Sequence, residues 1–397
     1  MSVLEGQSPV RRTDGTMLPA LTSLRFFAAL SIVVHHVKGL FLPADFFPAI
    51  SFGRAVSFFF VLSGFILVHV YPSLPTGRDV ARFLVSRAAR LWPAHLFGLL
   101  LVLVFLHHDA PLNTPGPLLA NIFLIHAWIP ITEYFFGYNG PSWTISTELG
   151  FYLLFPLLIY RFDTTWWWKL MLSAASLVAL VALATYWDMP TFPPPPGEPT
   201  RLAFIYMSPL GRLFEFVLGM TAALFWRRAP RVNWLGTAGW TVIEIAAFAV
   251  LAAQLWYVPW MYMQFYFSPL TLMREWPDHA GGCFSFVVVV FVMASSRGLI
   301  ARMLSFPVFV LLGEASYAVY ILHQVLSRIY AQYFHAALQL PYWAGLPLYL
   351  AALIGLSIAT FYWIENPIRR WAKGLVSARQ RAPINACDAR GDAVVTP

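Results

Sequence analysis

The stretch LPALTSLRFFAALSIVVHHVKGLF, residues 18–41, is apolar over a length that can cross a membrane as a helix. It also carries an arginine and two adjacent histidines, which are costly in a bilayer and therefore indicate a functional site. Arg25 and His36 are eleven residues apart. At about 3.6 residues per turn they share one helix face, about 16 Å apart, whereas His35 is rotated by about 100°. The spacing predicts that His36, rather than His35, faces the same groove as Arg25.

The composition is that of an all-α polytopic membrane protein. Of the 397 residues, 59% are hydrophobic and 11% are charged, which argues against a water-soluble globule. The net charge is +8, but the arginines cluster between apolar runs, as in cytoplasmic loops, and no nucleic-acid partner is expected. The first apolar run lacks a small-residue cleavage site, so no removable signal peptide is expected. The two cysteines suggest neither a disulfide framework nor a metal site.

Ten membrane crossings are expected from the apolar runs and from a cytoplasmic location of the arginine clusters. They cover residues 18–41, 54–71, 91–106, 143–160, 166–187, 206–226, 235–257, 281–296, 308–330 and 346–364. The apolar segment 118–131 has only fourteen residues, and we expect it to re-enter the membrane rather than cross it, which places Arg161 and both termini in the cytoplasm. The membrane domain then covers residues 18–373, between polar tails at 1–17 and 374–397.

A candidate catalytic pair consists of His36 and Glu148. Glu148 lies about one and a half turns from the outer end of its expected helix, and His36 lies in the outer half of its own. A carboxylate beside an imidazole suits a general base, because it orients the ring and stabilises the cation that forms. The alternative is a buried pair that only holds helices together.

A second candidate group is formed by Arg25, Arg87 and Arg90, which we expect at the cytoplasmic mouth of the same groove. Guanidinium groups bind phosphates in a bidentate manner. Alternatively, Arg87 and Arg90 set the topology and contact the phosphates of membrane lipids. A phosphate clamp with a base about 16 Å deeper describes a site for a long ligand with one charged end, such as acyl-coenzyme A.

Other polar groups in the apolar runs have weaker signals. Arg212 and Glu215 are one turn apart and are expected to neutralise each other. Ser63–Gly64 is interpreted as a close contact between helices, since small residues let helices approach. Glu244, Glu314 and His323 remain open between structural and functional roles.

At these residues the chain resembles the acyltransferase 3 family of bacterial membrane O-acyltransferases. The motifs that carry the resemblance are Arg25 with ten residues before His36, SFFFVLSGFIL (57–67), RAAR (87–90), SWTISTELGFYLLFP (142–156), LGEASYAVYILH (312–323) and ENP (365–367). Many members carry an aspartate where this chain has Ser57, so no carboxylate role exists at that position. Many also carry a serine at Thr144, where the hydroxyl is kept.

The resemblance implies transfer of an acyl group, usually acetyl, from cytosolic acyl-CoA to a hydroxyl, often on a surface glycan. It makes His36 the catalytic histidine, gives the three arginines to the donor and has Glu148 support the site. Residues expected to bind substrate or support the site are His35, Trp143, Thr144, Ser146 and His323. The implied setting is the bacterial inner membrane, with a carbohydrate acceptor, membrane lipids and glycan-assembly proteins as partners.

Two other classes of function stay open at this point. Buried histidine, glutamate and arginine in ten crossings also suit a proton-coupled transporter of an anionic solute, although the two halves lack a convincing repeat. A glycan-complex scaffold without chemistry is the third class. For an acyltransferase, the acceptor is a polysaccharide, a lipid-linked oligosaccharide or a small secreted molecule such as a macrolide, and the oligomeric state is open.

Overall fold

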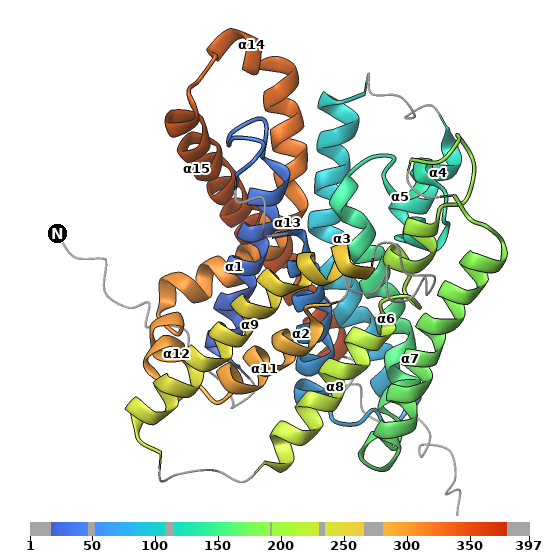
Figure 1. Cartoon of the computed structure of the whole chain (residues 1–397), viewed down its shortest axis with the longest axis vertical. Coiled ribbons are helices and arrows are strands. Elements are labelled where there is room, and N and C mark those ends of the chain that lie inside the picture. The colour runs from blue at the N-terminus through green and yellow to red at the C-terminus, as the bar shows by residue number, and fades with distance from the viewer. Residues whose placement is uncertain are drawn as a thin grey trace, which may run out of the picture.

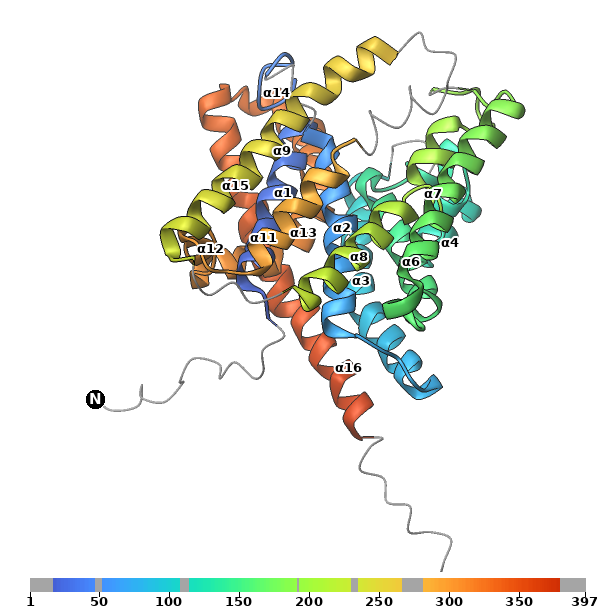
Figure 2. The same ribbon diagram turned by 60° about the horizontal axis from the view of Figure 1, so that its bottom comes forward.

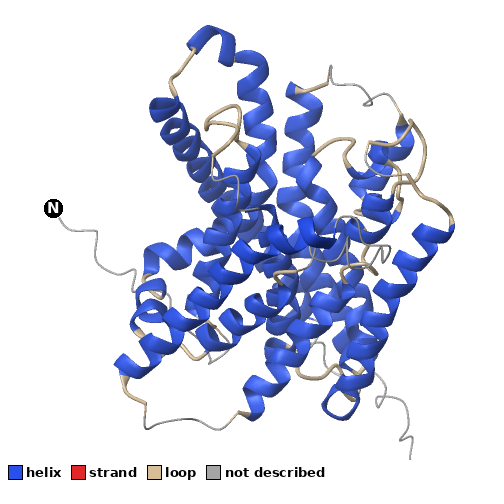
Figure 3. Ribbon diagram, viewed as in Figure 1, coloured by secondary structure: helices blue, strands red, loops and turns tan. Residues whose placement is uncertain are grey.

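The computed structural model describes residues 17–46, 52–107, 114–190, 193–229, 235–265 and 281–378. In these ranges the chain is helical and forms no strand (Figure 3), which confirms the expected all-α class. The tail expected over residues 1–17 lies outside the described ranges except for Met17, and so does the tail from residue 379 onward.

The main helices follow one another as a bundle (Figure 1). Their bounds are α1 (Pro19–His36), α2 (Ala55–Val70), α3 (Gly77–Phe105), α6 (Trp143–Ile159), α7 (Phe162–Tyr186), α8 (Leu213–Arg228), α9 (Thr237–Phe265), α11 (Cys283–Ala294), α13 (Pro307–Tyr333), α15 (Tyr342–Thr360) and α16 (Asn366–Ala378). Short helices between them are η1 (Phe52–Arg54), α4 (Pro115–Ile122), η2 (His126–Trp128), α5 (Thr132–Phe135), η3 (Gly140–Ser142), η4 (Leu202–Met207), α12 (Leu299–Leu304), α14 (His335–Leu338) and η5 (Phe361–Glu365).

Seven helices in the described ranges are long and apolar enough to cross a membrane, so the structure agrees with a multi-pass membrane protein. Seven of the ten expected crossings correspond to them. The other three expected crossings fall on α1, α8 and α11, which are helical but are not among the seven. The segment 118–131 forms no crossing helix, since it is divided among α4, η2 and the turns around them.

Several expected crossings differ in their bounds from the helices, and α3 begins at Gly77, fourteen residues before the crossing expected from residue 91. Two further differences have a clear physical cause. The first helix ends at His36 instead of Phe41, because Val37 leaves the helical conformation and Gly39, with φ +80°, turns the chain back. His36 is therefore the last helical residue of α1. The crossing expected over 206–226 begins only at Leu213, after a break at Ser208 that precedes Pro209.

Close helix contacts at glycines hold the centre of the bundle together. A Cβ built on Gly64 of α2 would lie 2.0 Å from the carbonyl oxygen of Phe216 in α8. A Cβ on Gly313 of α13 would lie 2.1 Å from the carbonyl oxygen of Thr22 in α1. Only glycine permits such close approach of two backbones. The interpretation of Gly64 as a packing residue is confirmed, and α1, α2, α8 and α13 form the frame of the site.

At one edge of the bundle, α16 and the first turns of α3 extend together beyond the other helices (Figure 2). The start of α3 is fixed by a capping box, in which Thr76 and Asp79 satisfy each other's backbone amides. η5 joins α15 to α16, and α16 continues to Ala378, beyond the boundary expected at residue 373. This edge carries arginines from both helices.

Candidate active site

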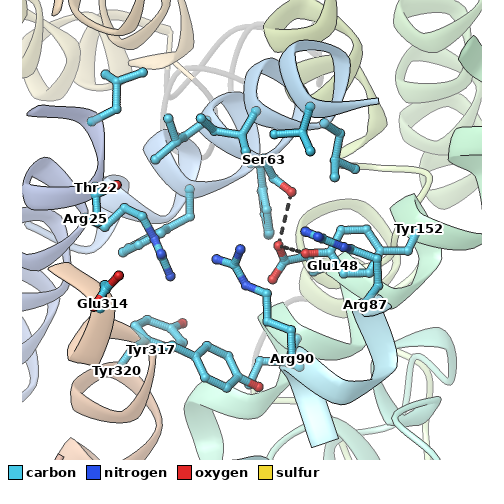
Figure 4. A pocket seen from close by; sticks show the side chains of 18 of the residues that line it. Thr22, Arg25, Ser63, Arg87, Arg90, Glu148, Tyr152, Glu314, Tyr317 and Tyr320 are labelled. Carbon is cyan, nitrogen blue, oxygen red and sulfur yellow. Dashed lines mark hydrogen bonds between the residues drawn. The ribbon is translucent and has the colours of Figure 1, made fainter. Parts of the chain in front are cut away.

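A cavity of about 320 Å³ lies between α1, α2, α3, α6 and α13, and is closed on one side by η5 and α16. Four arginines and three glutamates line it. They are Arg25, Arg87, Arg90, Arg369, Glu148, Glu314 and Glu365. The structure thus brings together the three arginines that the sequence predicts, with a fourth from α16. Their guanidinium groups point into the cavity from opposite sides where Figure 4 draws them.

Arg25 and Arg90 line the cavity without being held by a neighbouring side chain of the described ranges. Both are half-buried, and neither makes a hydrogen bond or an ion pair with any residue of the described ranges. Glu148 and Glu365 line the same cavity but form no direct ion pair with either arginine in the described ranges, and a guanidinium without a direct partner becomes costly where water is excluded. Two such groups facing one cavity therefore favour a ligand that brings negative charge, and guanidinium forks suit phosphate.

Arg87 is held differently from its neighbours. Its guanidinium donates to the Tyr71 hydroxyl at 3.2 Å and lies over the rings of Tyr71, Phe83 and Tyr152, 5.3–5.9 Å from their centroids. Aromatic faces attract cations. Arg87 is thereby fixed in the cavity wall, whereas Arg90 remains free to bind.

Glu148 lies among the arginines and not beside His36. Its carboxylate accepts hydrogen bonds from Ser63 at 3.1 Å and from Tyr152, as the dashed lines of Figure 4 show. The expected pairing of Glu148 with His36 is wrong. The start of α6 already lies beside Tyr320 of α13, whose hydroxyl donates to the Pro141 carbonyl at 3.4 Å. Glu148 follows further along α6, toward the arginine end.

The partner of His36 is His323. The two rings are joined by a contact of 3.2 Å between Nδ1 of His36 and Nε2 of His323. His323 Nδ1 lies 2.6 Å from the Tyr320 carbonyl oxygen, which can only accept, so the proton of neutral His323 is on Nδ1 and its Nε2 accepts. His36 must then donate from Nδ1, and it shares this donor with the Ile32 carbonyl at 3.0 Å.

The tautomer leaves Nε2 of His36 as the basic atom. In the described ranges nothing hydrogen-bonds to this nitrogen, and the side chain is exposed at the end of α1. A histidine whose Nδ1–H is bound by an acceptor is oriented to take a proton at Nε2. His323 thus has the orienting position that the sequence analysis gave to Glu148.

Tyr320 connects the histidine pair with the cavity. Its side chain lines the cavity, and His323 follows it by one turn of α13, which is a rise of about 4.5 Å. Phe59 faces Tyr320 across this end of the cavity with ring centroids 5.8 Å apart. The arginines therefore lie at one end of the cavity and the histidine pair lies just beyond the other.

The remaining predicted residues divide into cavity and support. Thr144 lines the cavity and donates to the Pro141 carbonyl. Trp143 packs on Tyr206 behind the cavity wall. Ser146 does not line the cavity, since its hydroxyl binds the backbone of Leu124 and Ala127 and fastens the 114–142 segment to α6. His35 is exposed beside η1 and is absent from the cavity wall.

Sequence reasoning missed several residues of the cavity. Ser63, interpreted only as a packing residue, donates to Glu148. Tyr152 follows Glu148 by four residues, a spacing that could have predicted their contact. Arg369 belongs to ENPIRRWAK, residues 365–373, one of the charge clusters that are expected in the cytoplasm because they set the topology. Its position directly after the ENP motif was a usable signal, because Glu365 of that motif lines the same cavity.

The buried pair Arg212–Glu215 is confirmed. Arg212 Nη2 lies 3.0 Å from the Glu215 carboxylate, and both side chains are 2% exposed. Ser57 joins this pair, because it receives a hydrogen bond from Arg212 at 3.0 Å and donates to Glu215 at 3.4 Å. The guanidinium also lies over the ring of Phe60, which lines the cavity. The group supports the cavity wall from behind.

Comparison with known proteins identifies the family of the chain. Residues 18–363 match the family model of an acyltransferase domain, acyltransferase 3. The acyltransferase MdmB of Streptomyces mycarofaciens is 30% identical over 335 residues, which covers 78% of this chain and 79% of that protein. No solved structure matches.

Two other relatives extend beyond this chain. The O-acetyltransferase OatA of Staphylococcus aureus is 26% identical over 89% of this chain, which spans 57% of OatA. The putative peptidoglycan O-acetyltransferase YrhL of Bacillus subtilis is 27% identical over 53% of this chain, which spans 33% of YrhL. Because the family model covers residues 18–363, which is most of the sequence, this chain belongs to the acyltransferase 3 family.

Proposed function

We propose that this protein transfers an acyl group, in the first place acetyl, from acyl-CoA to a hydroxyl of a carbohydrate. One observation carries the proposal: a cavity with two guanidinium groups free of protein partners ends one helical turn from an oriented histidine pair. The setting is the bacterial inner membrane, with the arginine end of the cavity facing the cytoplasm, where acyl-CoA is available.

The shape and charge of the cavity support acyl-CoA as donor. Its lining on α2 extends from Val56 to Val70, which corresponds to about 21 Å along the helix. Between the arginines and the histidine pair the wall includes the apolar side chains of Val56, Phe59 and Phe60 on α2. A long donor with its phosphates at one end and a neutral arm at the other matches this gradient, because the arginines stabilise only the charged end.

His36 supplies the base for the transfer. Its Nε2 takes the proton of the acceptor hydroxyl as that oxygen attacks the carbonyl carbon of the thioester. The bond between carbon and sulfur breaks, the ester forms, and the CoA thiolate leaves and takes up the proton from the imidazolium. His323 stabilises that imidazolium, because the hydrogen bond from Nδ1 to His323 becomes charge-assisted when His36 is protonated.

The acceptor enters from the end of the molecule where His36 is exposed. Two relatives are named O-acetyltransferases, and one of them a putative peptidoglycan O-acetyltransferase. These names favour a carbohydrate hydroxyl as the acceptor of this protein. A small secreted molecule is the second candidate, and glycan analysis of cells that lack the protein separates the two.

The test uses the purified protein in lipid vesicles with radiolabelled acetyl-CoA. We expect binding of acetyl-CoA by the wild type and by His36→Ala, weaker binding by Arg90→Ala, and transfer by the wild type alone. Glycan analysis of cells that lack the protein is expected to reveal a missing ester. Failure of acetyl-CoA to bind, or full transfer activity in His36→Ala, would refute the proposal. Binding of an anionic solute with no transfer would favour a transporter instead.

A further inference from the structure

A second cavity, of about 610 Å³, lies directly beside the cavity of about 320 Å³ described above, which we call the donor cavity after the proposed function. It is formed by the segment after α2, the first half of α3, and α16, at the edge where Figure 2 shows these two helices extending together. The two cavities share the residues Val70, Arg87, Arg90 and Arg369. The arginines of the donor cavity are therefore a common wall, and a ligand that contacts them reaches both spaces.

The second cavity is positively charged beyond the shared wall. Arg82 and Lys373 also line it, and its one carboxylate is Asp79. That carboxylate is already engaged, because it caps α3 and lies 3.6 Å from Arg82. Arg369 and Lys373 are four residues apart on α16 and so lie on one face. Excess positive charge in a concave space selects an anion.

The walls of the second cavity also offer apolar surface. Leu74, Pro75, Phe83 and Ala372 line it together with the charged residues. Its volume lies within the range of about 300–1,000 Å³ that is typical of small-molecule sites. The combination of apolar wall and arginine forks suits a ligand with a flat ring system and several phosphates.

We infer that the second cavity binds the adenosine 3′,5′-bisphosphate end of coenzyme A, with the diphosphate bridge at the shared arginines and the pantetheine arm in the donor cavity. This inference rests on the proposed function and deepens it. It assigns Arg82, Arg369 and Lys373 to donor binding, and makes α16 part of the site. All negative charge of the donor then lies where arginine and lysine concentrate, and the neutral arm lies between apolar walls.

The test measures competition by adenosine 3′,5′-bisphosphate for acetyl-CoA binding to the purified protein in neutral-lipid nanodiscs. We expect the bisphosphate to displace acetyl-CoA from the wild type. Arg369→Ala is expected to weaken binding of both ligands about tenfold, and Lys373→Ala about threefold, because its side chain is exposed. Arg370→Ala is the matched control, since Arg370 is exposed on α16 and lines neither cavity.

A second measurement compares acetyl-CoA with S-acetylpantetheine, which lacks the nucleotide. Lys373→Glu should lower the ratio of kcat/KM for acetyl-CoA over that for S-acetylpantetheine by about tenfold. If acetyl-CoA binds and reacts but the bisphosphate does not compete, the inference is wrong while the proposed function stands. The inference also fails if added anionic lipid displaces acetyl-CoA while the bisphosphate does not, and if the substitutions at Arg369 and Lys373 weaken this displacement by lipid. If wild-type protein does not bind acetyl-CoA, the proposed function itself fails.

Discussion

Replacement of His323 by phenylalanine tests the orientation of the base. The substitution keeps a ring in the buried position but removes the acceptor of the His36 Nδ1–H, which lies 3.2 Å from His323 Nε2. This bond is neutral in the resting protein and gains charge when His36 takes a proton. A hydrogen bond to a charged group is worth about 1.5–3 kcal/mol, which corresponds to a fall in kcat of about 10- to 150-fold.

The assay is steady-state transfer from radiolabelled acetyl-CoA by protein reconstituted in vesicles. KM for acetyl-CoA should stay within about twofold, because His323 is absent from the wall of the donor cavity. His323→Gln should recover part of kcat, since its side-chain carbonyl can accept from His36. Thermal unfolding of each variant separates a loss of catalysis from a loss of folded protein, as His323 is fully buried.

Glu148→Gln is the comparison that decides between the two candidate partners of His36. Glutamine can accept the hydrogen bonds that Ser63 and Tyr152 donate to Glu148, and the substitution removes no bond to His36. We expect kcat to change by less than about threefold, which is small beside the loss in His323→Phe. A fall of kcat by two orders of magnitude in Glu148→Gln, with normal kcat in His323→Phe, would refute the assignment of the base's partner.

Three further predictions concern the donor cavity and its frame. Arg90→Ala should raise KM for acetyl-CoA about 10- to 100-fold, and lysine should restore part of the affinity because it keeps the charge but not the fork. Gly64→Ala should lower the unfolding temperature in detergent, since the new methyl group would lie 2.0 Å from the Phe216 carbonyl oxygen and overpacking costs about 1–3 kcal/mol. Arg212→Met should destabilise the protein by about 3–5 kcal/mol by leaving Glu215 buried and unpaired, and adding Glu215→Leu should restore stability.

Matched controls exist for two of these changes. Arg370→Ala removes an exposed arginine that lines neither cavity and should leave KM unchanged. Gly355→Ala adds a methyl group on α15 where no atom lies within 4 Å, so the unfolding temperature should not fall. Equal loss of stability in Gly355→Ala and Gly64→Ala would contradict the argument from close backbone contact.

The arginine end of the site was predictable from the sequence because charge in an apolar chain has few explanations. Arg25, Arg87 and Arg90 do line one cavity, as their sequence positions predict. Helix periodicity also predicted that His36, rather than His35, faces the groove of Arg25. The structure gives His36 the histidine partner, but the cavity that Arg25 lines does not include His36. The prediction for the histidines depends on their positions within one helix, and the prediction for the arginines depends on charge near a helix end. Both kinds of information are present in the local sequence.

The position of Glu148 was not predictable in the same way. Its depth was counted from an outer surface assumed to coincide with the start of α6. The 114–142 segment folds inward instead: Asn139 donates to the carbonyl of Ile321 in α13, so the start of α6 is already level with the middle of α13. Because this reference level was wrong, the predicted depth placed Glu148 beside His36, whereas it lies beside the arginines. Depth within a membrane bundle depends on how neighbouring helices are offset, which a single sequence does not contain.

The separation of the two ends of α1 now has a structural basis. Arg25 faces the donor cavity, which continues into the second cavity at the edge formed by α3 and α16. His36 is the last residue of the same helix and is exposed at the opposite end. On the proposed function, donor and acceptor approach from opposite ends of the bundle, and only the short region between Tyr320 and the His36–His323 pair is common to both paths. On that proposal the acyl group leaves CoA at one end and forms its ester at the other, so α1 carries a residue of the donor path, Arg25, and a residue of the acceptor path, His36.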